Sequence, residues 1–81
     1  MKPQFKNLLN QQIVSYNKLP KEKQLKCIVS LKKGIALDKE RIAGVKPYYI
    51  VGAEIFVQMV NEIPTLKNKE VTDRWIENFN E

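Results

Sequence analysis

The feature that most constrains the fold is an apolar stretch at Tyr48–Val60, with the sequence YYIVGAEIFVQMV. Ten of its thirteen residues are apolar or aromatic, and only Gly52, Glu54 and Gln58 interrupt it. Because such a segment has no side suited to water, the rest of the chain must pack around it. A chain of 81 residues is long enough for one modest core, so we expect residues 1–81 to form a single domain.

The length of this stretch favours a helix over a strand. Its β-branched residues are typical of strands, but thirteen residues exceed a usual strand of about five or six. Pro47 suits the first position of a helix, and Pro64 disfavours helical backbone at the residue before it. We therefore predict a central apolar helix at 47–62, in which Gly52 permits close approach of another helix. The stretch is too short for a membrane span, which needs about 20 apolar residues.

Hydrophobic periodicity predicts two helices before the central one. At 3–19 the apolar residues recur on one face and the polar residues lie outside it. A second helix is expected at 21–33, with Gly34 as the left-handed residue that ends it. The alternative is a strand at 26–32, where KCIVSLK is rich in β-branched residues. A strand there, or in the central stretch, would make the fold α+β.

A short helix and a final helix complete the predicted fold. The short helix is expected at 39–43, because Asp38 before it is a good N-cap residue. The final amphipathic helix is expected at 69–80, with Thr65 and Asn68 as its two alternative caps. The predicted fold class is therefore all-α: a compact bundle of about four helices plus one short helix, packed around the central apolar helix.

Charge is distributed unevenly along the chain, whose net charge is +5. Residues 1–47 hold eleven Lys and Arg against three acids, a net charge of +8, whereas residues 48–81 hold three against six, a net charge of −3. Twelve of the fourteen basic residues are lysine. Lysine binds polyanions without reading bases, which is the role that planar arginine serves best. A basic face that meets an acidic partner or a polyanion is the functional interpretation, and a solvated surface is the plain one.

The basic residues concentrate around the predicted turn before the central helix, where two tyrosines follow them. A phosphate-tracking patch with adjacent aromatic rings is typical of proteins that bind nucleic acid without sequence preference. This possible patch for a polyanion or acidic partner consists of Lys32, Lys33, Lys39, Arg41 and Lys46, with Tyr48 and Tyr49 next to it.

A helix-turn-helix at 36–55 is the base-reading form of the nucleic-acid hypothesis. Gly44 and the residues after it are similar to the turn and second helix of repressor-type DNA readers. However, Glu40 occupies a position where such motifs need a small apolar residue. The second helix also begins with tyrosine and aliphatic residues, where a groove reader presents Arg, Asn, Gln or Ser. The pattern therefore disfavours a base-reading motif.

Catalysis is the least supported class of function. The chain has no histidine for acid–base work and no Gly-rich phosphate loop. Its single cysteine, Cys27, lies beside Lys26 but has no partner base, and it is more typical of a small core residue. We expect no enzyme activity, no cofactor and no metal site. One cysteine also excludes a disulfide within the chain.

A protein-binding or regulatory role is the favoured interpretation. Small basic chains without catalytic groups are common among accessory and inhibitor proteins, including those that phages and plasmids encode. The start of the chain, MKPQFKNLL, lacks the apolar core of a signal peptide, which predicts a cytoplasmic protein. We also expect a homodimer, since few short helices must cover many apolar residues. The apolar anchors predicted for a partner are Trp75, Phe79, Tyr48 and Tyr49.

Overall fold

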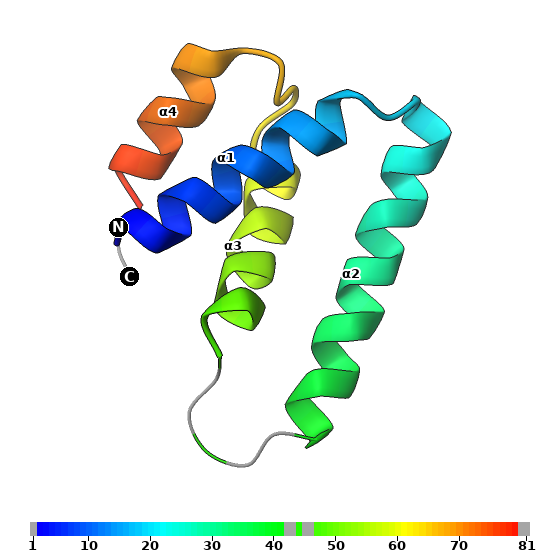
Figure 1. Cartoon of the computed structure of the whole chain (residues 1–81). Helices are drawn as coiled ribbons and strands as arrows, with labels where there is room; N and C mark the ends of the chain where they lie inside the picture. Colours follow the sequence, from blue (N-terminus) through cyan, green and yellow to red (C-terminus); the bar gives the residue numbers. More distant parts are fainter. Residues whose placement is uncertain (1, 42–43, 45–46, 80–81) are drawn as a thin grey trace.

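The computed structural model describes residues 2–41, 44 and 47–79, and these residues form four helices (Figure 1). The described ranges contain no strand, so the strand alternatives are wrong and the all-α prediction is confirmed. The helices are α1 (Pro3–Asn17), α2 (Lys21–Arg41), α3 (Tyr48–Glu62) and α4 (Lys69–Glu77).

Helix α3 supplies more fully buried residues than any other helix of the described chain. It packs against both α1 and α2, and Figure 1 shows α2 and α4 on opposite sides of it. Phe56 and Met59 are at most 1% exposed, and Leu9 of α1 meets them in the same core cluster. The buried residues of α3 are Ile50, Gly52, Ala53, Ile55, Phe56 and Met59.

Gly52 of α3 faces Leu8 of α1. A Cβ built on Gly52 would overlap Leu8 Cδ2, so the missing side chain leaves the space that the Leu8 side chain occupies. The sequence predicts that Gly52 permits close approach of another helix, and the Leu8 contact is consistent with that prediction.

Helix α2 is longer than the sequence predicts. Gly34 does not end it, because the helix continues to Arg41, and among the described residues positive φ occurs only at Gly44, where φ is 104°. The predicted short helix at 39–43 is not separate: residues 39–41 are the last turn of α2, and 42–43 lie outside the described residues. Asp38 is consequently an interior residue of α2 and not an N-cap. The helix therefore tolerates at Gly34 a propensity cost of about 1 kcal/mol relative to alanine.

The segment before α4 is held by three side-chain hydrogen bonds. Asn68 is the N-cap: its Oδ1 accepts from the Val71 N–H at 3.3 Å. Thr65 does not cap the helix, because its hydroxyl accepts from Lys67 N–H within the turn. Asn17 Nδ2, at the end of α1, donates to the Leu66 carbonyl at 2.9 Å and ties this segment to the bundle.

We predict that Phe56→Ala lowers the free energy of unfolding by about 3–5 kcal/mol, because it empties a fully buried site. Leu25→Ala, on the exposed side of α2, should cost less than about 1 kcal/mol, since Leu25 is 65% exposed. Urea denaturation followed by circular dichroism measures both values. Equal losses in the free energy of unfolding for the two substitutions would contradict the assignment of Phe56 to the core and of Leu25 to the surface.

The Gly52 contact predicts an energetic coupling between Gly52 and Leu8. In a Leu8→Ala background, Gly52→Ala should stabilise the protein by about 1 kcal/mol, the helix propensity gained by alanine. With Leu8 present, the same substitution should lose most of that gain, because Leu8 must rotate away at a cost of about 0.5–1.5 kcal/mol. A double-mutant cycle measures the difference. A coupling of zero would show that the two residues do not touch.

Candidate interaction surfaces

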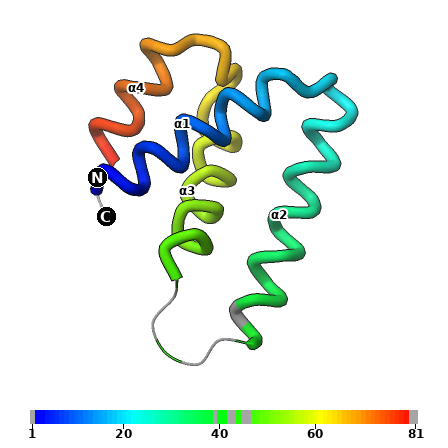
Figure 2. The backbone as a smooth tube through the Cα atoms, viewed as in Figure 1, coloured from blue at the N-terminus to red at the C-terminus, as the bar shows by residue number. Residues whose placement is uncertain are grey.

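Helix α2 is the helix least covered by the rest of the molecule. None of its described side chains is fully buried, although it carries as many aliphatic residues as the core helices. Leu25 is 65% exposed, the highest value among the large hydrophobic residues, and Val29 and Leu37 are 52% and 51% exposed. Figure 2 shows that α2 meets the bundle along one side only. Apolar side chains on its other side therefore face solvent.

Two of these residues lie in one line along the helix with a third exposed residue, Ala36. Leu25, Val29 and Ala36 are spaced by four and seven residues, which places them within about 40° of one another around the helix axis. We call Leu25, Val29 and Ala36 the outer stripe. Lys32 lies at its margin, between Val29 and Ala36 along the axis. Half-buried Leu31 lies on the opposite side of the helix and packs against the core.

Charged residues border the outer stripe. Glu22 and Glu40 lie about one turn beyond its two ends. Along its length lie three lysines: Lys26 and Lys33 flank one side, and Lys32 lies on the other. All three are exposed, and none has an ion-pair or hydrogen-bond partner among the described residues. Lys32 and Lys33 belong to the basic patch that the sequence predicts. Lys26 does not belong to that patch; the helix places it beside both Leu25 and Val29.

The predicted basic patch does not form one face in the described part of the chain. Because α2 continues without a break, Lys32 and Arg41 are nine residues apart on one helix, and they point to opposite sides of it. Lys46 and the side chain of Lys39 lie outside the described residues. The described residues therefore do not provide a continuous phosphate-binding surface through all five residues of the predicted patch.

A second apolar surface is a groove between α1 and α2, floored by α3. Two adjoining hollows of about 450 and 370 Å³ make up the groove. The Oε1 atom of Gln12 is buried there without a hydrogen-bond partner. The residues that both hollows share are Leu8, Gln12, Cys27 and Leu31.

Tyr16 lies in the same groove. Burial raises the pKa of its hydroxyl above the usual value of about 10, and Cys27 adds to this in the same direction. Because the ionised form is disfavoured in the folded state, Tyr16 contributes stability below about pH 10 that is lost as the pH rises further.

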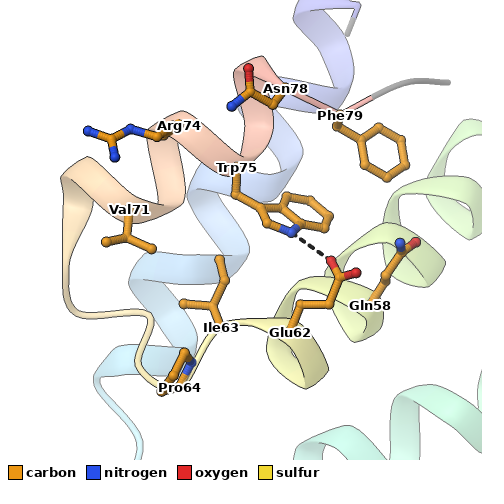
Figure 3. Close-up of a pocket in the computed structure, with 9 residues that line it drawn as sticks. All are labelled: Gln58, Glu62, Ile63, Pro64, Val71, Arg74, Trp75, Asn78 and Phe79. Atoms are coloured by element: carbon orange, nitrogen blue, oxygen red, sulfur yellow. Dashed lines mark hydrogen bonds between the residues drawn. The ribbon is translucent and has the colours of Figure 1, made fainter.

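The predicted anchors Trp75 and Phe79 lie in a cleft between α4 and the end of α3 (Figure 3). The cleft has a volume of about 560 Å³, and both aromatic rings are half-buried against the core. Trp75 Nε1 donates to Glu62 Oε2 at 2.7 Å, and the rings of Trp75 and Phe79 are 5.2 Å apart. These contacts hold α4 to α3, so the two aromatics close the edge of the core.

The other two predicted anchors lie at the opposite end of α3. Tyr48 and Tyr49 are 55% and 50% exposed at its first turn, about 20 Å from Glu62 along the helix axis. Their rings pack edge to face at 6.3 Å, and Tyr48 also contacts Phe5 at 6.5 Å. The four aromatic residues therefore belong to two separate surfaces, not one.

Neither a metal centre nor a membrane helix is visible in the part of the chain that the structure describes. No three Cys, Asp or Glu side chains there come together in a group that could hold a metal ion. None of the helices over the same residues is both long and apolar enough to cross a bilayer. Comparison of the chain with protein-family models, curated proteins and solved structures finds no match.

The Trp75–Glu62 hydrogen bond predicts a modest, acceptor-dependent contribution to stability. Glu62→Leu removes the acceptor and should lower the free energy of unfolding by about 1 kcal/mol, since the bond is exposed to solvent. Glu62→Gln keeps an acceptor oxygen and should cost less. Fluorescence of Trp75, the only tryptophan of the chain, reports both unfolding and the local contact. Equal stability of the Leu and Gln variants would show that the bond contributes nothing.

Proposed function

We propose that the protein is a small, non-enzymatic, cytoplasmic protein-binding module of the accessory or inhibitor type, which acts by occupying a surface of a partner. Helix α3 serves as the centre of the bundle, and α2 is the element that meets the partner. The observation that carries this proposal is the outer stripe of α2. Leu25 and Val29 are more than half exposed on a helix of 21 residues that buries no described side chain fully.

The energetics of α2 explain why a partner is expected. In proteins most helix stability comes from packing of an amphipathic face, and α2 has only one half-buried face within this chain. Full burial of a Leu or Val side chain stabilises a fold by about 1.5–3 kcal/mol. Leu25 and Val29 are each less than half buried, so each contributes less than half of that value within this chain. A protein that covers the stripe would supply the remaining burial. Exposed apolar residues that line up and are rimmed by charge are typical of interaction sites.

The second candidate function is nucleic-acid binding through exposed lysines of α2. Lys26, Lys32 and Lys33 are all exposed without an ion-pair partner in the described residues, which favours contact with a polyanion. The outer stripe counts against it, because phosphate offers no burial to leucine and valine. Binding to nucleic acid would fall steeply with salt, whereas apolar docking would change little.

Substitution on the outer stripe separates these functions. We predict that Val29→Asp abolishes capture of protein partners from a lysate of the source cells, because it places a carboxylate at the centre of an apolar contact. Nuclease-treated lysate and quantitative mass spectrometry of the retained proteins measure the effect. The chain should remain folded, since Val29 is 52% exposed.

Val14→Asp is the matched control. Val14 is 55% exposed on α1, so the same substitution there tests the chemical change away from the stripe. Partners retained by wild type and Val14→Asp but lost from Val29→Asp support docking on α2. Retention of the same partners by all three proteins would refute it. Retention that disappears with nuclease would instead favour nucleic acid.

A further inference from the structure

We infer that the outer stripe of α2 binds an acidic amphipathic helix of a partner protein. The inference rests on the proposed protein-binding function and adds the shape and charge of the element that docks. Three observations support it. The exposed apolar residues are aligned, unpaired lysines lie beside them, and these lysines would repel the same lysines of a second copy of the chain.

The shape of the stripe suits a helix. Leu25 and Ala36 are separated by about 16 Å along the axis of α2, or three helical turns. The stripe is a straight ridge on a convex surface, and it offers no row of unpaired backbone groups to which a strand could add. Ridges of this kind pack side by side with the ridges of another helix that carries apolar residues three and four positions apart.

The charges beside the stripe select an acidic partner. Between Leu25 and Ala36 the charges beside the stripe are all positive: Lys26 and Lys33 flank one side, Lys32 lies on the other, and no described acid pairs with any of them. The acids on the Lys26 side, Glu22 and Glu40, lie beyond the two ends of the stripe, so the positive charge is confined to its length. A partner helix with Glu or Asp on both sides of its apolar face would place carboxylates against these ammonium groups. Complementary rim charges of this kind raise the association rate and reject partners of the wrong sign.

The same charges disfavour a second copy of this chain as the occupant. In a symmetric antiparallel pair of α2 helices, the two-fold axis passes near the middle of the stripe. Such an axis brings the Lys26 and Lys33 flank of one helix next to the same flank of the other helix. Lys26 and Lys33 of one copy would then lie beside the same lysines of the other copy. Like charges in this arrangement repel, so the homodimer expected from the sequence is not the favoured occupant of this surface.

Three synthetic helical peptides of 18 residues test the inference directly. The first carries leucines in one helical stripe with glutamates on both flanks. The second is its basic twin, with lysine in place of each glutamate, and the third has the composition of the first in a scrambled order without an apolar face. Fluorescence anisotropy of the labelled peptides, titrated with the full chain at two salt concentrations, gives the dissociation constants.

We expect the acidic amphipathic peptide to bind at least about ten-fold more tightly than either of the other two. Lys32→Glu combined with Lys33→Glu should weaken this binding by about ten-fold or more, and so should Val29→Asp. The control variants Lys67→Glu and Val14→Asp change equally exposed residues outside α2 and should leave the dissociation constant within about two-fold of wild type. Circular dichroism confirms that each variant is folded.

Each other result overturns the inference in a distinguishable way. Equal binding of the scrambled acidic peptide would identify a general polyanion patch, and equal binding of the basic twin would identify apolar docking without charge selection. A concentration-dependent dimer in sedimentation that Val29→Asp dissolves would make a second copy the occupant. If no peptide binds while Val29→Asp still loses its lysate partners, the acidic-helix inference fails and the protein-binding function stands. Unchanged lysate capture by Val29→Asp would refute that function itself.

Discussion

The burial of α3 is the constraint on which the rest of the structure depends. Its side chains are apolar on almost every side, so α1 and α2 must both cover it. The cover from α1 is close because Gly52 has no Cβ to keep Leu8 away. Phe56 and Met59 reach almost complete burial as a result, and most of the hydrophobic stabilisation of the fold arises around them.

This arrangement leaves α2 only partly covered. The molecule measures 37 × 29 × 18 Å, so it is thin in one direction. A helix in such a thin bundle has one face toward the core and another toward solvent. A short chain has too little sequence to cover the second face, so Leu25 and Val29 stay exposed. The exposed stripe is thus a consequence of the same packing that buries α3.

The two ends of the bundle serve different purposes. At the α4 end, Trp75 is held by Glu62 and Phe79 and closes the core, which accounts for two of the aromatic residues that the sequence marks as anchors. Along α2, the residues that the proposal uses carry no aromatic ring and give a weaker signal in the sequence. Leu25, Val29 and Lys26 form a surface only because an unbroken helix aligns them.

Sequence alone determined the features that depend on local chemistry. These are the helical nature of the apolar stretch and the place of Gly52 within it, because length and a missing Cβ act within a few residues. For the cap of α4 the sequence offered both Thr65 and Asn68, and the structure selects Asn68. Only the tertiary structure decided that α2 runs through Gly34 to Arg41, since α2 packs against α3 and keeps its helical course despite the weak helix propensity of one glycine. That continuity places Arg41 and Lys32 on opposite sides of one helix and extends the outer stripe to Ala36, so the full candidate site could not be read from residue order alone.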